Sequence, residues 1–277
     1  NNDTCSLGDW KVNYDKLPSG IDGLAEKINK IGMKFGLWFE PEMISPDSDL
    51  YREHPDWAIH IDEREGVQSR NQMVLDLSRD EVCEYVINAV SDILANANIE
   101  YVKWDMNRQL TDMPRLGYNH EYTLGYYKIM SAITEKFPNI LFEGCSAGGG
   151  RFDAGVLAYM PQIWTSDNSD AIARLKMQYS TSMCYPVYSI SSHVTASPNH
   201  QCGRDTSLKT RADVAYCGTF GYELDVTKMS DEEFEEIKAQ IEFEKRIQDL
   251  MCNGDLYRLI NPYETNYCSW EVISKDK

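Results

Sequence analysis

The chain has 277 residues and a formal net charge of −17, which is enough sequence for one large α/β domain. This excess of negative charge argues against nucleic acid or an anionic membrane as a partner, because both require a basic surface. No apolar run approaches the roughly 18 residues of a membrane-spanning helix, so we expect no membrane partner, and the acidic surface suits a neutral ligand such as a sugar.

Short apolar runs recur along the chain and predict a series of β-strands. Periodicity alone cannot separate runs this short from buried helix, but their regular alternation with helical segments favours strands. In chain order, with the last two weaker, the expected strands are 34–40, 72–77, 101–105, 140–145, 162–167, 188–191 and 217–221.

Amphipathic segments between these runs predict helices. Residues 21–31 carry apolar side chains at helical spacing. Ser78 followed by Glu81 has the spacing of a capping box, which predicts that Ser78 caps a helix running to about Ala97. Further helices are expected at 121–137, 170–183 and 231–251.

Alternating strands and helices predict a parallel sheet covered by helices. We expect an α/β fold, a (β/α)8 TIM barrel apparently lacking its first strand, because only seven strands can be counted. An open sheet would usually show a glycine-rich phosphate loop after its first strand, and the sequence has none. The missing strand should precede Asn1. Two short strands near 256–260 and 269–273 read as the beginning of a C-terminal β domain. The expected domains are therefore 1–254 for the incomplete barrel and 255–277 for the second domain, in an excerpt from a larger protein.

Acidic residues stand at the ends of several expected strands, where a barrel carries its active site. A lone acid is more often a salt-bridge partner or a helix cap, and Asp170 reads as such a cap. The acids as a group are harder to dismiss, and two on strand ends are the minimum for a glycosidase. The strand-end acids are Glu40, Asp76, Asp105, Glu143 and Asp167.

The residues around these acids indicate how the rim is built. Lys103 shares a strand face with Asp105, and we expect it to help keep Asp105 ionised. Trp38 shares parity with Glu40 and is expected to face the pocket, whereas Trp104 is expected to pack in the core. The glycines that follow Cys145 allow close approach of the backbone to a ligand.

The eight cysteines and five histidines bear on compartment and metal. The cysteines are spread out without a CxxC pair, so we expect free thiols in a reducing compartment and a cytoplasmic location. Neither HxH nor HExxH occurs among the histidines, which argues against zinc. For His193, a structural role is favoured over a catalytic one.

Several motifs, standing in order along the chain, resemble the α-galactosidases of glycoside hydrolase family 36. They are Leu7–Gly8–Asp9–Trp10, the segment 36–43 (GLWFEPEM), the segment 103–108 (KWDMNR), the segment 145–149 (CSAGG) and the segment 164–170 (WTSDNSD). Family members also carry an Asp-Asp-Gly-Trp-Phe segment, an N-terminal β-sandwich and a larger C-terminal β domain, and none of these matches this chain.

The resemblance implies a retaining exo-α-galactosidase with Asp105 as nucleophile and Asp167 as general acid/base. It implies an α-galactoside oligosaccharide as substrate, no metal and no organic cofactor, and a homo-oligomeric parent protein, often a tetramer. The galactose site implied by the resemblance consists of Trp38, Arg70, Lys103, Asn107, Cys145 and Gly148.

Two alternatives remain open on the sequence. Asp76, Asp105 and Glu143 end successive expected strands and could hold Mg²⁺ in an enolase-type barrel, with His193 as a weak candidate base. Alternatively, the chain is an inactive sugar-binding fragment. The aglycone, and the choice between galactose and N-acetylgalactosamine, are not predicted.

Overall fold

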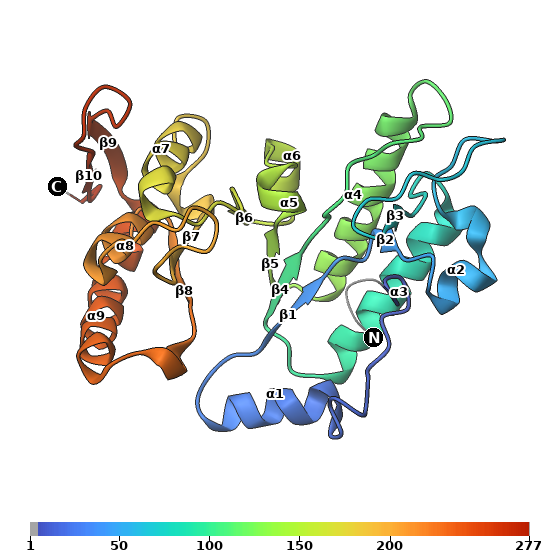
Figure 1. Cartoon of the computed structure of the whole chain (residues 1–277), viewed down its shortest axis with the longest axis horizontal. Helices are drawn as coiled ribbons and strands as arrows, with labels where there is room; N and C mark the ends of the chain where they lie inside the picture. Colours follow the sequence, from blue (N-terminus) through green and yellow to red (C-terminus); the bar gives the residue numbers. More distant parts are fainter. Residues whose placement is uncertain (1–4, 277) are drawn as a thin grey trace. The chain divides into compact units, whose positions relative to one another are not determined.

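The computed structural model describes residues 5–276. The chain divides into two compact units, the first ending at Pro161 and the second beginning at Gln162. The first unit holds a three-stranded parallel sheet with helices beside it (Figure 1). Its elements are α1 (Gly20–Lys30), β1 (Gly36–Phe39), β2 (Met43–Ile44), α2 (Asp49–Glu53), η1 (Pro55–Trp57), β3 (Met73–Val74), α3 (Asp80–Asn96), β4 (Tyr101–Trp104), α4 (Tyr118–Lys136), β5 (Leu141–Gly144), α5 (Ser146–Gly149) and α6 (Ala154–Leu157).

β4 is the central strand of the sheet in the first unit. Tyr101 at its start pairs with Gly36 on one side and with Leu141 on the other. Alternate residues of β4 are buried, with Val102 and Trp104 fully enclosed, as expected for a strand whose two faces differ. The other face carries Lys103 and leads to Asp105, so the register of β4 sets where these two side chains lie.

The second unit also holds a three-stranded parallel sheet, in which β7 is central. Its core forms where α8 packs on β7 around Val194 and Ala215. The elements are β6 (Gln162–Trp164), α7 (Ala171–Thr181), η2 (Val187–Ser189), β7 (Ile190–Thr195), α8 (Leu208–Ala215), β8 (Thr219–Glu223), η3 (Val226–Lys228), α9 (Asp231–Asn253), β9 (Asp255–Ile260) and β10 (Ser269–Ile273).

The predicted fold class is confirmed: parallel strands alternate with helices in both units, as in part of a (β/α)8 barrel. The two short strands predicted near the C-terminus are present as β9 and β10, and the structure pairs them antiparallel. The domain boundary at residue 254 and the strand expected before Asn1 stay predictions. In the described residues, no helix is both long and apolar enough to cross a membrane.

The prediction of a barrel strand at 72–77 is wrong. Only Met73–Val74 is a strand, and it pairs antiparallel with Met43–Ile44 outside the parallel sheet. β1 pairs directly with β4 instead. The apolar run did indicate burial, since Val74 and Leu75 are buried, but burial does not tell which partner a strand takes. Asp76 therefore does not end a strand of the barrel sheet.

The capping box predicted at Ser78 is also wrong. α3 begins at Asp80 after Arg79, which makes no side-chain capping bond. The residue before the helix is thus Arg79 and not Ser78, whose hydroxyl donates to Asp76 Oδ1 at 2.6 Å. A capping box does occur at α9, where Ser230 and Glu233 exchange hydrogen bonds, and Asp170 caps α7 as predicted.

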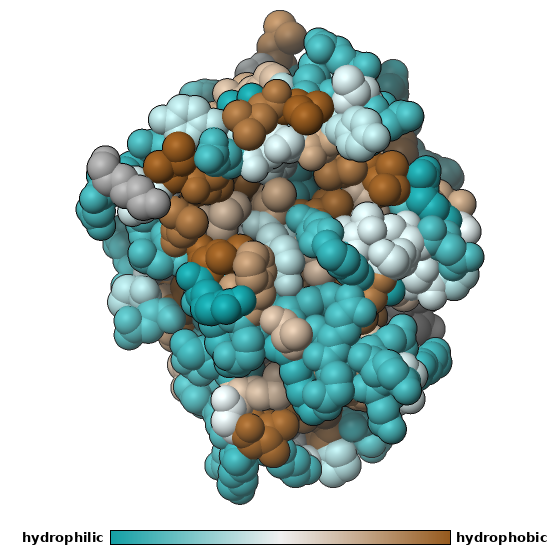
Figure 2. All heavy atoms as spheres, turned by 90° about the vertical axis from the view of Figure 1, so that its left-hand side faces the viewer, coloured by the Kyte–Doolittle hydropathy of each residue, from teal (hydrophilic) through white to brown (hydrophobic). Residues whose placement is uncertain are grey.

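Apolar side chains reach the surface around the C-terminal hairpin. Tyr267 is 75% exposed, and Leu259 and Tyr263 are more than half exposed. Figure 2 shows apolar side chains gathered among polar ones on the face of the molecule that lies on the left of Figure 1, where β9 and β10 are drawn.

Candidate active site

Asp105 directly follows β4, and its side chain is the centre of the candidate site in the first unit. Its backbone N–H donates to Phe39 O at 2.7 Å, which joins the end of β4 to the end of β1. The carboxylate is only 5% exposed. Such a buried carboxylate needs hydrogen-bond donors to remain charged.

Five donors surround the Asp105 carboxylate. Trp38 Nε1 and Asn107 Nδ2 donate to Oδ2 at 3.1 and 2.7 Å. The backbone N–H groups of Met106 and Ala147 donate to Oδ1 at 2.8 and 3.3 Å. The thiol of Cys145 donates as well. The structure thus brings Trp38, Asn107 and Cys145 together at Asp105.

The hydrogen bonds decide the charge state of Asp105. Burial is the largest single influence and raises its pKa, but the donations from Asn107, Cys145, Ala147 and Trp38 together outweigh burial, so the pKa is lowered. The carboxylate is therefore ionised at neutral pH, as a nucleophile requires.

Lys103 pairs with a carboxylate on the neighbouring strand β5. Its ammonium forms an ion pair with the fully buried Glu143, with Nζ 3.3 Å from Oε1. Lys103 and Glu143 stand opposite each other in the register of β4 and β5, which explains the pairing. The lowering of the Asp105 pKa comes from its hydrogen-bond donors.

Cys145 directly follows β5, and the short α5 after it is a left-handed turn, not a regular helix. Ser146 and Ala147 both have φ of 52°, and Gly148 and Gly149 have φ of 80° and 91°. Residues with side chains rarely adopt this conformation, whereas glycine does so readily. The turn aims the Ala147 N–H at Asp105. Burial is the main cause that raises the pKa of the Cys145 thiol, to about 12, so the thiol keeps its proton and acts as a donor.

Glu40 is a second buried acid beside Asp105. It follows β1, is 2% exposed, and accepts from the Asn107 N–H at 2.6 Å and from Gln72 Nε2 at 3.4 Å. Burial is the main cause that raises its pKa to about 7, and the nearby Asp105 charge adds to the effect. Arg70, which is exposed, acts in the opposite direction.

The raised pKa of Glu40 predicts a pH-dependent stability. Between about pH 4.5 and 7 the folded protein holds a proton that the unfolded chain releases, so stability falls as the pH rises through this window. We expect the free energy of unfolding to fall by at most about 3 kcal/mol through this group between about pH 5 and 7.5. Glu40→Gln should remove that part, since its amide does not titrate.

Chemical denaturation at the two pH values measures this effect. The experiment uses the complete protein, meaning this chain with whatever sequence flanks it in nature. Glu84→Gln is the matched control, because the Glu84 side chain is 69% exposed and should leave the pH dependence unchanged. An unchanged pH dependence in Glu40→Gln would contradict the assignment to this group.

Asp167 belongs to the second unit, in the loop that follows β6. Its side chain is exposed, and Oδ1 accepts from Trp164 Nε1 at 3.1 Å. Arg174 fixes the loop by donating to Thr165 Oγ1 and to the carbonyl oxygens of Ser166 and Asn168. Its guanidinium also lies 4.2 Å from the centre of the Trp164 ring. The loop therefore presents the Asp167 carboxylate to solvent from a rigid base.

The structure argues against Asp76 as a metal ligand of the enolase-type alternative. Asp76 lies off the parallel sheet, and its carboxylate accepts from Ser78 and from the Tyr118 hydroxyl at 2.6 Å. Glu143 is paired with Lys103. Among the described residues, no three His, Cys, Asp or Glu side chains gather as metal ligands would. His193 Nδ1 lies 3.3 Å from Glu223 Oε2, and its ring is tilted by 31° against the Trp164 ring.

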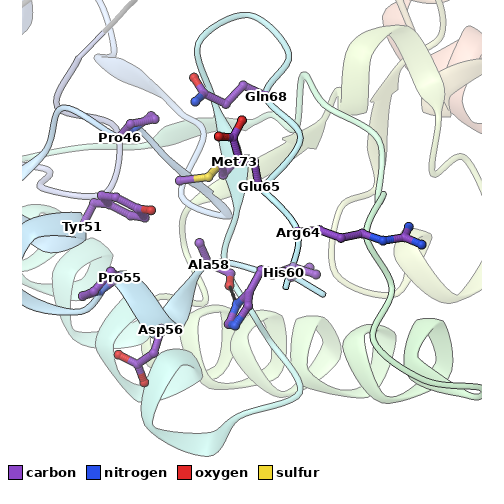
Figure 3. Close-up of a pocket in the computed structure, with 12 residues that line it drawn as sticks. Pro46, Tyr51, Pro55, Asp56, Ala58, His60, Arg64, Glu65, Gln68 and Met73 are labelled. Carbon is purple, nitrogen blue, oxygen red and sulfur yellow. Dashed lines mark hydrogen bonds between the residues drawn. The ribbon is translucent and has the colours of Figure 1, made fainter. Parts of the chain in front are cut away.

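A separate hollow of about 590 Å³ lies in the first unit beside α2 and η1. Figure 3 shows its lining, with His60 Nδ1 turned to the Ala58 carbonyl oxygen at a distance of 3.0 Å. Within the described part of the chain, the lining includes none of the residues predicted for the site. The candidate site therefore stays at Asp105.

Sequence reasoning missed part of this site. The backbone N–H groups of Met106 and Ala147 leave no signature in the residue types around them. The glycines that follow Ala147 were the available signal, because they permit the left-handed turn, but they indicated a ligand contact and not a donor to Asp105. The role of Glu42, which is described below, was also missed, because its partners lie far from it in sequence.

Comparison with known proteins identifies the family. The family model described as Melibiase matches residues 1–254. Alpha-galactosidase AgaA of Geobacillus stearothermophilus is 53% identical over 283 residues, covering 99% of this chain and 39% of that protein. Alpha-galactosidase Mel36A of Lactobacillus acidophilus is 48% identical, covering 99% and 38%. The chain belongs to the melibiase family, which confirms the resemblance to family 36 of the glycoside hydrolases.

Solved structures agree with this assignment. The crystal structure of the family 36 α-galactosidase AgaB from Geobacillus stearothermophilus has a TM-score of 0.97 at 53% identity, covering 99% of this chain and 39% of that one. A variant of AgaA in complex with raffinose gives a TM-score of 0.97 at 52% identity, with the same coverage. The chain spans about two fifths of the length of these relatives.

Proposed function

We propose that the complete protein is a retaining glycoside hydrolase that releases terminal α-linked galactose by double displacement. The observation that carries the proposal is the Asp105 carboxylate, buried yet held ionised by five donors. Family membership supports the substrate class, since solved relatives are α-galactosidases and AgaA variants are seen with raffinose and with stachyose.

Asp105 and Asp167 take the two roles of the mechanism. Asp105 attacks the anomeric carbon while Asp167 gives its proton to the departing glycosidic oxygen, which leaves a β-galactosyl ester on Asp105. Asp167 then takes a proton from water as the water attacks the anomeric carbon, and galactose leaves with its α configuration kept. A retaining enzyme needs carboxyl groups about 5–5.5 Å apart, which a crystal structure of the complete protein can measure.

The remaining residues of the site bind and orient the sugar. Trp38 is 45% exposed and offers a flat apolar surface next to Asp105, suited to the C–H face of galactose. Asn107, Lys103 and Arg70 offer donors for sugar hydroxyls, while Cys145 and Gly148 form the wall made by the left-handed turn. The cytoplasmic location and the tetrameric assembly stay predictions.

Product analysis by NMR tests the proposal. We expect hydrolysis of p-nitrophenyl α-galactoside, raffinose and stachyose with α-galactose as the first product, and no hydrolysis of p-nitrophenyl β-galactoside. Activity should persist in EDTA, whereas an enolase-type enzyme would lose it. A first product of β configuration would contradict the retaining mechanism. Galactose binding by the complete protein without turnover would favour the sugar-binding alternative.

A further inference from the structure

Glu42 is a buried carboxylate outside the ring of donors around Asp105. It follows β1, directly before β2, and is fully buried. Its Oε1 accepts from Trp104 Nε1 at 2.8 Å and from Arg151 at 2.6 Å, and its Oε2 accepts from the Tyr122 hydroxyl at 2.7 Å and from Arg151 at 2.9 Å. Every lone-pair direction of the carboxylate is used, and the pairing with Arg151 is bidentate.

Arg151 connects this carboxylate to the left-handed turn. While two of its guanidinium nitrogens bind Glu42, the third, Nε, donates to Ser146 Oγ at 2.8 Å. The guanidinium also lies over the Tyr126 ring, 4.1 Å from its centre. One planar group thus ties the first residue of the turn to a point between β1 and β2.

Contacts from outside the turn must stabilise its backbone conformation. Ser146 and Ala147 are both in the left-handed region, which is unfavourable for residues with side chains. Ser146, Ala147 and Gly150 also border a cavity of about 470 Å³ that Tyr122 and Tyr126 line.

We infer that Glu42 and Arg151 are positioning residues that act through Ser146 to hold the 146–150 turn where it donates the Ala147 N–H to Asp105. The inference rests on the proposed function, since it gives the pair a purpose in preparing the nucleophile. Cys145 directly precedes this turn, and its thiol is a second donor to Asp105, so two of the five donors depend on the position of the turn.

Two variants separate positioning from stability. Ser146→Ala removes only the link between Arg151 and the turn, and leaves the buried ion pair intact. Arg151→Lys keeps the positive charge but loses the fork that binds Glu42 and Ser146 together. Tyr127→Phe is the matched control, because Tyr127 lines the same cavity and its hydroxyl bonds to Asp153.

We expect both variants of the complete protein to lower kcat by about tenfold, the effect of losing one hydrogen bond to a charged group, with a smaller change in KM. The acidic limb of kcat/KM should move to higher pH, because Asp105 loses donors. Neither variant replaces another titratable residue near Asp105 in this unit; these residues are Glu40, Cys145 and Lys103. Tyr127→Phe should behave as wild type.

A crystal structure of Ser146→Ala tests the inference without relying on activity. The wild-type distance from Ala147 N to Asp105 Oδ1 is 3.3 Å, and it should lengthen beyond hydrogen-bonding range. An unmoved turn, or a lower Tm in both variants with kcat and pH profile unchanged, would overturn the inference. An inactive wild type with the turn displaced in Ser146→Ala would overturn the proposed function alone.

Discussion

Asp105→Gly is expected to lower the turnover of p-nitrophenyl α-galactoside by the complete protein at least about a thousandfold, as loss of a covalent nucleophile does in other enzymes. The carboxylate that should form the galactosyl ester is then absent, while Trp38 and Asn107 still line the site. Azide should restore activity by occupying the vacated space and attacking the anomeric carbon once. Because that is a single displacement, the product should be β-galactosyl azide.

Steady-state kinetics and NMR of the azide product measure both effects. Asp76→Asn is the matched control: Asp76 is another acid of the same unit, and an asparagine keeps an oxygen to accept from Ser78 and Tyr118. It should retain kcat within about tenfold. Near wild-type turnover by Asp105→Gly, or an azide product of α configuration, would remove Asp105 as nucleophile.

Asp167→Ala should affect substrates according to their leaving groups. Raffinose needs a proton on its departing sugar oxygen, so kcat/KM should fall by about 10²–10⁴-fold, the range for general acid catalysis. An aryl galactoside with an acidic phenol needs little protonation, so galactosylation of Asp105 should persist and the ester should accumulate. Azide should then attack the ester and yield α-galactosyl azide, the opposite configuration from Asp105→Gly.

Asp205→Asn in the same unit is the control, because Asp205 is exposed and contacts Ser197. Equal loss of kcat/KM on raffinose and on the activated aryl galactoside would show that Asp167 is not the acid. Mass spectrometry of the Asp167→Ala protein during turnover should detect the added galactosyl group on the peptide that contains Asp105.

Much of the fold could be predicted because apolar runs and alternation identify buried strands. β1, β4, β5 and β6 lie where the sequence placed them. The segment 72–77 failed because local pattern reports burial and not the pairing partner, and Met73–Val74 found its partner in Met43–Ile44. The predicted cap at Ser78 failed because α3 begins at Asp80, one residue later than the capping-box spacing requires, and a sequence motif does not fix the residue at which a helix starts.

The sequence indicates which side chains stand near Asp105, but it does not indicate how they are connected. Asp105 follows from its place after a strand, and Trp38 follows from parity along β1. The pairing of Lys103 with Glu143 joins two strands far apart in sequence, so no local pattern indicates it. The backbone donor at Ala147 depends on a strained turn, and strain is set by the tertiary structure around it.

The protonated state of the Cys145 thiol has a practical consequence for labelling. Maleimides and iodoacetamides react with thiolates, and burial keeps Cys145 in the unreactive form. Cys184, Cys202 and Cys252 are exposed instead. Fluorophores or spin labels can therefore be attached at those surface positions while Cys145 stays chemically untouched.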